Sequence, residues 1–374
     1  MSGKSAIAMA RPRVKAEHAP YRIGGGKIRI GGISYPIAAE IDDPAGWVWT
    51  LLMAMDGSRE LSAVVDHVYR AHPELTEETV LRGAEQLVAS GYVEDAVMHR
   101  PAGLSERDLE RYDRATGFFR WMDLAPRQSS WEPQELLRNA RVTLLGVGGT
   151  GGVAAMALAA SGVGKLHCVD PDVVELSNLS RQVLYTEDDI GTQKAAAAVA
   201  RLRRLNSDIE VTGERLEARG TADVGRLAAG CDVLLLAADQ PLELREWANT
   251  ACLAARRPWV YAGYHGPRIQ VGTFVPGTGA CLECLLLENR DEHAALGVRV
   301  EDAPGPNQAV HRAVGAASAG ISGYLAAHQV IAMITGIPPV VPGRIDAVNL
   351  VALDAPFSVT GRPRADCPAC RGAG

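Results

Sequence analysis

Five glycines within seven residues follow an apolar run at a spacing that suits phosphate binding. They are Gly146, Gly148, Gly149, Gly151 and Gly152. The run before them, Val142–Leu145, predicts a strand, the small residues Val153–Ala160 predict a helix, and Lys165–Val169 predicts a second strand. Glycine lets the backbone turn tightly and approach a phosphate, and a helix N-terminus favours negative charge. This stretch therefore predicts a nucleotide-binding strand–helix–strand unit.

The residues after the second strand narrow the choice of nucleotide. An acid about 20 residues beyond such glycines can bind a ribose, so Asp170 suits either NAD or ATP. The segment that follows it carries a spaced polar set, namely Asp172, Ser177, Asn178, Arg181 and Gln182. With this motif the chain resembles the ThiF/MoeB adenylyltransferase family, relatives of the ubiquitin-activating enzymes. The resemblance implies that ATP is bound and a carboxylate is activated as an acyl-adenylate.

Two further residues stand where this family contacts Mg-ATP. Lys194 lies in the first turn of a helix predicted over Thr192–Leu205. The N-terminal end of a helix disfavours a cation, so a bound anion would explain a lysine there. Asp239 follows a predicted strand, although Gln240 replaces the family's asparagine. The resemblance implies catalytic roles for Arg181, Lys194 and Asp239. It implies nucleotide contacts from Gly146, Gly148, Gly149, Gly151, Asp170, Asp172, Ser177, Asn178, Arg181, Lys194 and Asp239. Within that set, Asp170 would hold the ribose, Asn178, Arg181 and Lys194 the phosphates, and Asp239 Mg²⁺.

A helix predicted to begin at Ser105 supplies another candidate. Arg111, Tyr112 and Arg114 match the family's Arg-Tyr-x-Arg-Gln element, and Ala115 replaces its glutamine. In the family this arginine reaches the ATP phosphates of a neighbouring subunit. The resemblance implies a homodimer in which Arg114 acts in trans; an ordinary solvated helix face is the alternative.

Two Cys-x-x-Cys pairs have the spacing of a zinc site. Cys281 and Cys284 form one pair, and Cys367 and Cys370 form the other. Four thiolates complete a tetrahedral site with no open position for water, which indicates a structural role. Redox-active pairs are the alternative. Cys168, Cys231 and Cys252 lie in strand or helix contexts and are expected to pack in the core.

The segment between the two pairs begins with Leu285–Gln308, which is expected to be a mobile loop. In the ubiquitin-activating branch of the family the corresponding segment carries a catalytic cysteine that forms a thioester. Here it contains no cysteine. The resemblance therefore implies adenylation without a thioester step. A long apolar helix over Ala309–Thr335 follows and is expected to pack on the sheet.

Strands and helices alternate from residue 141 onward, which predicts an α/β fold with a doubly wound, Rossmann-like, mainly parallel sheet. The strand at Arg268–Val275 is expected to begin an antiparallel extension, and further strands are expected at Ile345–Leu350 and Ala352–Phe357. We assign residues 141–374 to an ATP-binding adenylation domain and residues 97–140 to a helical connector.

Residues 20–96 predict a small winged-helix-like α+β domain with three helices and three short strands, at Tyr21–Ile23, Lys27–Ile30 and Ser34–Ala39. The segment Val48–Val68, with Asp56-Gly57-Ser58 between two helices, resembles the peptide-binding module called a RiPP recognition element, as in the PqqD family. The resemblance implies that a leader peptide adds to the small sheet as a strand. A domain used for dimer contacts is the alternative. Residues 1–19 are expected to be a disordered tail.

Composition excludes several classes of function. The 374 residues are 47% hydrophobic and 22% charged, with a formal net charge of -6 and no long basic stripe, which argues against nucleic-acid binding. No apolar run reaches about 18 residues, so no membrane span is expected. Seven cysteines without a signal peptide predict a cytoplasmic location and metal binding in place of disulfides.

The combination of both domains predicts a peptide-tailoring enzyme similar to MccB-like peptide-maturation enzymes in natural-product (RiPP) biosynthesis. Its cofactors would be ATP, Mg²⁺ and structural Zn²⁺, and its partner a precursor or leader peptide. Three alternatives stay open: MoeB-like activation of a ubiquitin-like sulfur carrier protein, a non-catalytic leader-peptide scaffold, and an NAD-dependent oxidoreductase.

Overall fold

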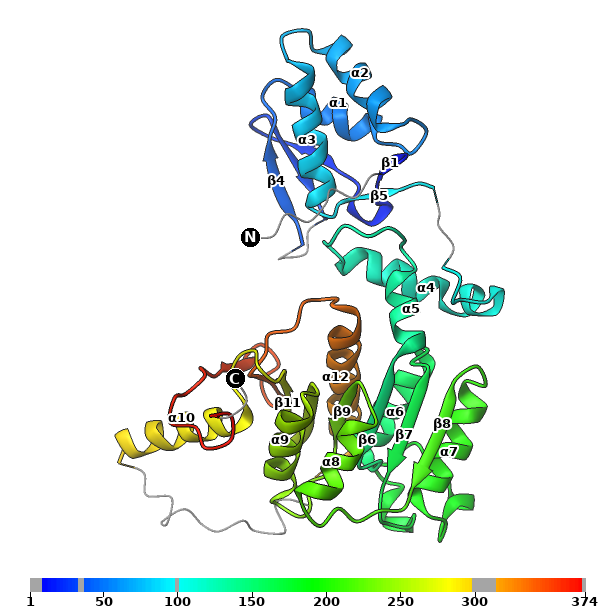
Figure 1. The fold of residues 1–374 in the computed structure, drawn as a ribbon, viewed down its shortest axis with the longest axis vertical. Helices are drawn as coiled ribbons and strands as arrows, with labels where there is room; N and C mark the ends of the chain where they lie inside the picture. Colours follow the sequence, from blue (N-terminus) through cyan, green and yellow to red (C-terminus); the bar gives the residue numbers. More distant parts are fainter. Residues whose placement is uncertain (1–8, 33–36, 98–100, 298–313, 372–374) are drawn as a thin grey trace. The chain divides into compact units, whose positions relative to one another are not determined.

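The glycine-rich loop follows β6 (Arg141–Leu145), which is the middle one of five parallel strands in an eight-stranded sheet with the order β13-β12-β11-β10-β9-β6-β7-β8 (Figure 1). The structure is a computed structural model that describes residues 9–32, 37–97, 101–297 and 314–371. By their contacts, Met1–Leu136 and Leu137–Gly374 form two units, and the sheet belongs to the second.

Five strands of this sheet are parallel and three extend it in antiparallel fashion. The parallel set is β6 (Arg141–Leu145), β7 (Lys165–Val169), β8 (Glu210–Glu214), β9 (Val233–Leu236) and β10 (Trp259–His265). The antiparallel set is β11 (Arg268–Phe274), β12 (Arg344–Asn349) and β13 (Phe357–Thr360). The predicted fold class is confirmed, because the sheet is mostly parallel and carries an antiparallel extension.

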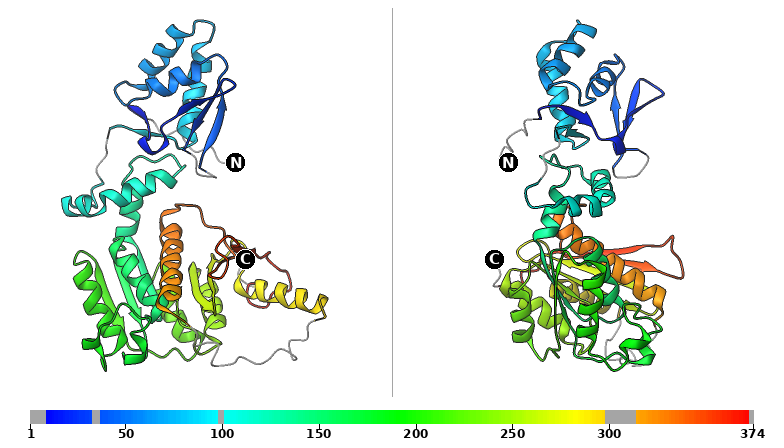
Figure 2. Two further views of the ribbon diagram at one scale, coloured as in Figure 1. Left: turned by 180° about the vertical axis from the view of Figure 1, so that it is seen from behind. Right: turned by 90° about the vertical axis from the view of Figure 1, so that its right-hand side faces the viewer.

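Helices cover both faces of the sheet (Figures 1 and 2). On one face lie α6 (Gly149–Ala160), α7 (Lys194–Leu205) and α12 (Ala316–Thr335). On the other lie α8 (Thr221–Ala229) and α9 (Leu244–Ala255). Helix α12 is long and apolar enough to cross a membrane by length and composition alone. It packs against α6 and the sheet, however, as a core helix does.

Close packing of α6 on α12 depends on small residues. A Cβ on Gly323 of α12 would lie 2.5 Å from the Thr150 carbonyl oxygen, and a Cβ on Gly149 would lie 3.0 Å from the Ala319 Cβ. Gly149 contacts Ala319, and Thr150, further along α6, contacts Gly323, further along α12. The two helices therefore run parallel. Their N-termini therefore lie at the same end of the sheet.

The first unit contains a three-stranded antiparallel sheet and three helices. The strands are β2 (Tyr21–Ile23), β3 (Lys27–Ile30) and β4 (Ala39–Asp42). The helices are α1 (Trp47–Ala54), α2 (Leu61–Ala71) and α3 (Glu77–Ala89). The Thr76 side chain caps α3 by accepting a hydrogen bond from the Thr79 N–H. Next come β5 (Val93–Asp95), α4 (Glu106–Met122) and α5 (Glu132–Asn139).

The prediction of a disordered tail over residues 1–19 is wrong for its second half. Strand β1 (Pro12–Val14) pairs with β5, and η1 (Ala16–His18) follows it. The buried Lys15 donates a hydrogen bond to the Asp123 carbonyl oxygen at 2.7 Å. These partners lie about a hundred residues away in sequence, so local composition could not reveal them. Residues 1–8 lie outside the described residues.

The predicted mobile loop Leu285–Gln308 is also wrong in its first part. Helix α10 (Leu282–Ala295) occupies it, and Leu285 is buried against the core beneath the sheet. The first turn of α10 is buried and anchors the helix, whereas its charged C-terminal part is exposed. Residues 298–313 lie outside the described residues, and they include the start of the predicted helix Ala309–Thr335.

Two predicted strands are displaced along the chain. The strand expected at Ser34–Ala39 lies at Ala39–Asp42, and residues 33–36 are outside the described residues. The strand expected at Ala352–Phe357 lies at Phe357–Thr360, because the residues before it form the turn that follows β12.

Candidate functional site

The glycine loop joins the end of β6 to the start of α6. Gly146 has a φ of 94°, which a residue with a side chain rarely adopts. A Cβ on Gly151 would lie 1.9 Å from the Gly146 carbonyl oxygen, so the helix could not approach the strand end with any other residue there. The loop therefore leaves the first N–H groups of α6 directed away from the strand, where an anion can bind.

Asp170 fixes this loop from the end of the next strand. Its Oδ2 accepts a hydrogen bond from the Val147 N–H at 2.9 Å, and its Oδ1 accepts one from the Asp172 N–H at 3.0 Å. Burial raises the pKa of this carboxyl group, and Lys194 opposes that shift. Asp170 thus holds the glycine loop in place. The sequence had predicted only that Asp170 would bind the ribose.

Lys194 is brought beside the same turn. It is the first residue of α7, and its N–H donates to the Asp172 carbonyl oxygen at 2.9 Å. Its Nζ donates to Asp172 Oδ2, also at 2.9 Å. The Lys194 side chain is only 7% exposed, whereas that of Asp172 is 62% exposed. The structure therefore presents a buried cation next to a solvent-exposed carboxylate.

The polar motif after β7 wraps around the loop. It forms η2 (Leu176–Asn178), in which Asn178 Oδ1 accepts the Glu175 N–H at 3.2 Å. The Arg181 side chain donates to the Ser177 carbonyl oxygen at 3.0 Å. A Cβ on Gly149 would lie 3.2 Å from the Arg181 carbonyl oxygen, so the motif contacts the start of α6.

Two buried polar atoms beside the loop have no hydrogen-bond partner among the described residues. They are Thr150 Oγ1, in the first turn of α6, and Gln182 Oε1. Gln182 Nε2 lies 3.6 Å from the position of a Cβ on Gly148. Sequence reasoning missed Thr150 because a threonine at a helix start is ordinary. Unpaired polar atoms at a helix N-terminus fit a polar ligand such as a nucleotide.

Asp239 is exposed just beyond the carboxyl end of β9. Its charge acts on the phenol groups of Tyr261 and Tyr264, and the charge of Arg181 also acts on Tyr264. Asp239 and Arg181 therefore both lie near Tyr264, at the edge where ligands bind in open α/β sheets. A carboxylate there fits Mg²⁺ by its donor type.

Arg114 lies on α4 in the first unit and is exposed to solvent. Its neighbour Tyr112 is buried in the same helix. Exposure is compatible with a contact to a second subunit, and the role of Arg114 in trans stays a prediction.

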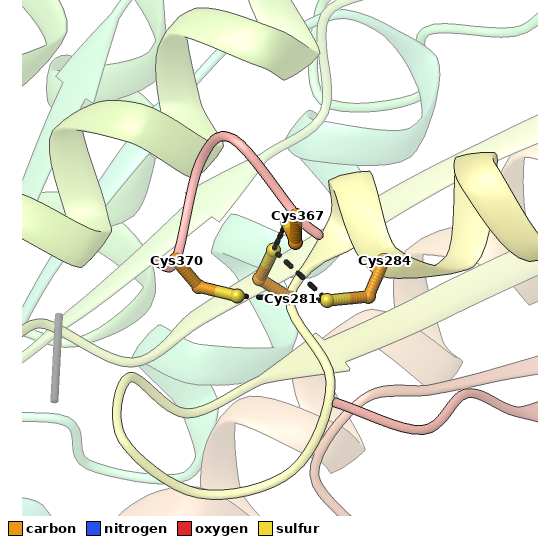
Figure 3. A group of neighbouring side chains, drawn as sticks. All are labelled: Cys281, Cys284, Cys367 and Cys370. Carbon is orange, nitrogen blue, oxygen red and sulfur yellow. Dashed lines mark hydrogen bonds between the residues drawn. The ribbon is translucent and has the colours of Figure 1, made fainter. Parts of the chain in front are cut away.

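The four paired cysteines come together at one point (Figure 3). Their sulfur atoms all lie within 4.8 Å of one another. Cys281 Sγ lies 3.8 Å from Cys284 Sγ and 3.6 Å from Cys367 Sγ, and the sulfurs of Cys284 and Cys370 are 3.6 Å apart. Zinc–sulfur bonds of about 2.3 Å in a tetrahedron place sulfurs about 3.8 Å apart. The donor set and spacing fit a structural zinc ion.

Neighbouring side chains fix this centre. Cys281 precedes α10, whose first N–H, on Leu282, donates to the buried Asn249 Oδ1 at 3.0 Å. Arg364, just before the second pair, donates to Asp291 of α10 at 2.6 Å. Cys168, Cys231 and Cys252 are buried elsewhere in the unit as free thiols, so their predicted packing role is confirmed.

Sequence comparison finds the ThiF family over residues 121–369. The SAMP-activating enzyme E1 of Haloferax volcanii is 34% identical over 64% of this chain and 83% of its own length. The vegetative HesA protein of Trichormus variabilis is 32% identical over 71% of this chain and 91% of its own. The sulfur carrier protein ThiS adenylyltransferase of Bacillus subtilis is 39% identical over 41% of this chain and 46% of its own.

Solved structures share the fold over nearly the whole chain. Escherichia coli MccB, crystallised with ATP, has a TM-score of 0.74 at 23% identity and covers 96% of this chain and 99% of its own. MccB has also been crystallised with AMPCPP and MccA. PaaA has a TM-score of 0.66 at 26% identity, over 93% of this chain and 99% of its own.

Proposed function

This chain belongs to the ThiF family and is an ATP-dependent adenylyltransferase, and we propose that it activates the carboxylate of a ribosomal peptide held through its leader. In such a reaction a carboxylate oxygen attacks the α-phosphorus of ATP, pyrophosphate leaves, and an acyl-adenylate forms. The enzyme would then act in the biosynthesis of a peptide natural product.

The first unit is the observation that carries the peptide assignment. The family match begins at residue 121, and the three curated relatives cover at most 71% of the chain. The MccB and PaaA structures instead cover 96% and 93% of it, so their shared fold includes the first unit. An adenylation domain that activates a carrier protein has no evident need for this addition. The addition is explained if the first unit binds the leader of a peptide substrate, away from the carboxylate that reacts.

The small sheet of the first unit offers a way to hold a peptide. In the order β2-β3-β4, the outer strands β2 and β4 each pair on one side only within the described residues. Tyr21 on β2 and Leu81 on α3 are exposed apolar side chains. An extended leader that added to an outer strand would gain main-chain hydrogen bonds, and these apolar side chains would contact it.

In the second unit, the ATP phosphates would be bound by the α6 N-terminus, Asn178, Arg181 and Lys194. Asp170 would bind the ribose, and Asp239 would bind Mg²⁺. Mg²⁺ held by Asp239 would offset negative charge on the phosphates. Lys194 is already desolvated and needs only to exchange its exposed Asp172 partner for a phosphate. This preorganised positive charge is the main contribution that such a site makes to phosphoryl chemistry. Arg114 of a second subunit would complete the site in a homodimer.

Cysteine placement supports adenylation without a thioester step. All seven cysteines lie in the described residues, with four at the metal centre and three buried in the core. Burial raises the pKa of the Cys168 thiol to about 12. None of the seven is placed to act as an exposed nucleophile.

Activation of a sulfur carrier protein is the second candidate, and the name of the Bacillus subtilis relative, a sulfur carrier protein ThiS adenylyltransferase, favours it. ATP–pyrophosphate exchange separates the two. We expect exchange with short synthetic peptides encoded beside the gene, supplied as free acids. Exchange that depended on a carrier protein ending in Gly-Gly, with no peptide active, would replace the peptide proposal.

A further inference from the structure

Tyr264 lies near the end of β10, at the carboxyl edge of the sheet, where ligands bind in open α/β folds. Strand β10 continues to His265, although its parallel partner β9 ends at Leu236, opposite Tyr261. Residues 262–265 therefore run beyond the end of β9 while still paired with β11. They lie beside the segment that carries Asp239, at the carboxyl edge of the sheet.

The pleat of β10 decides which side of the sheet each tyrosine faces. Tyr261 packs in the core beneath α9, and the Arg245 guanidinium lies 4.2 Å from its ring centre. A Cβ on Gly263 would lie 2.7 Å from the Tyr261 hydroxyl, so positions 261 and 263 share that face. Because successive side chains alternate, Tyr264 points to the opposite face.

That opposite face is the one that carries the glycine loop. Ser322 of α12 donates to the Gly263 carbonyl oxygen at 3.3 Å, which fixes α12 against this end of β10. Helix α12 in turn contacts Gly149 through Ala319. Tyr264 is therefore on the same side of the sheet as the parallel N-termini of α6 and α12.

The electrostatic surroundings of Tyr264 agree with this placement. Burial raises the pKa of its phenol, Asp239 raises it further, and Arg181 lowers it. The hydroxyl thus stays protonated, and the charges of Asp239 and Arg181 both act on it. Among the described residues it has no hydrogen-bond partner, so its donor is available to a ligand.

We propose that the Tyr264 hydroxyl donates a hydrogen bond to the carboxylate that becomes adenylated, and holds it between Arg181 and Asp239. One carboxylate oxygen forms the bond to the α-phosphorus, the bond from that phosphorus to pyrophosphate breaks, and pyrophosphate keeps the electron pair. Tyr264 contacts the other oxygen and transfers no proton. This inference rests on the proposed nucleotide site and holds for a peptide or a carrier protein.

Binding of two probes tests the proposal without a known substrate. Calorimetry would compare AMP with a non-hydrolysable glycyl-sulfamoyl adenosine, which places an acyl carbonyl beside the nucleotide. Tyr264→Phe should bind the acyl compound about tenfold more weakly, with AMP affinity changed by less than about twofold. The matched control is Tyr261→Phe, which removes the same hydroxyl on the other face and should change neither affinity.

Three results would count against the proposal in different ways. If Tyr264→Phe binds the acyl compound as tightly as the wild type does, Tyr264 has no contact with the acyl group. If both probes weaken equally, Tyr264 acts on the nucleotide or on the fold. If the wild-type protein binds neither probe, the nucleotide-site assignment itself fails.

Discussion

Lys194 and Asp172 form an ion pair in which only the lysine is buried. The exposed Asp172 carboxylate is solvated with or without its partner, so this pair itself contributes at most about 1 kcal/mol to stability. Lys194 also opposes the rise that burial causes in the pKa of Asp170, but that carboxyl group keeps its two backbone hydrogen bonds when the lysine is removed. The structural role of Lys194 is therefore small and can be separated from a role in binding phosphate.

Lys194→Ala should lower ATP–pyrophosphate exchange by about a hundredfold, because a preorganised cation at the phosphates is removed. Thermal unfolding should change little. Arg201→Ala is the control, since its 2.9 Å ion pair with Asp189 lies outside the proposed site, and its exchange rate should match the wild type. A Lys194→Ala enzyme with near-normal exchange would refute the phosphate assignment.

At this scale the sequence predicted residue types better than residue contacts. The motif from Asp170 to Gln182 indicated which side chains gather at the loop, because its spacing is specific. It did not indicate that Asp170 accepts two backbone N–H groups, or that Lys194 pairs with Asp172. Those contacts depend on how β7 and α7 meet, which spacing alone does not determine.

The glycine loop gives a prediction about an element. Gly151→Ala should destabilise the second unit and abolish ATP binding, since its Cβ would lie 1.9 Å from the Gly146 carbonyl oxygen. Gly225→Ala is the matched control, because a Cβ there meets no atom within 4 Å in α8. That control should gain up to about 1 kcal/mol from helix propensity. Thermal unfolding and ATP calorimetry would measure both, and normal ATP binding by Gly151→Ala would contradict the loop geometry.

The metal centre ties the C-terminal turn to α10, so it should contribute to the stability of the second unit. We expect about one zinc per chain by elemental analysis. A metal bound at a thousand times its Kd stabilises by about 4 kcal/mol. Cys370→Ser should therefore lose the zinc and lower the Tm by roughly 10 °C.

Cys231→Ser is the control for that experiment. Its thiol lies outside the centre and donates to the Ala228 carbonyl oxygen, a bond that a serine can keep. It should retain zinc. A wild-type protein that is metal-free and equally stable would overturn the metal assignment.

Among the elements, the sequence predicted those with a strong local pattern and missed those set by distant partners. The alternation after residue 141 predicted the parallel strands. Strand β1 and helix α10 were missed because β5 and the metal centre order them, and both partners lie far away in sequence. Their own composition resembles that of a tail and a loop.

For the whole molecule, the two units predict that the leader and the reacting end of a peptide bind separately. Removal of the leader should raise the KM for the remaining peptide by at least about tenfold, because tethering supplies effective concentration, and should leave kcat largely intact. The leader alone should compete with the full precursor and leave the shortened peptide unaffected. A shortened peptide with an unchanged KM would mean that the first unit does not hold the leader.

The fate of a heavy oxygen label tests the central claim most directly. A precursor peptide with an isotopically labelled terminal carboxylate would be incubated with the enzyme and ATP, and the released AMP analysed by mass spectrometry. If the carboxylate attacks the α-phosphorus, cleavage of the acyl-adenylate leaves one labelled oxygen on AMP. We predict labelled AMP with the free acid and none with the peptide amide. Unlabelled AMP from the free acid, or AMP released only with a Gly-Gly carrier protein, would contradict peptide activation by this enzyme.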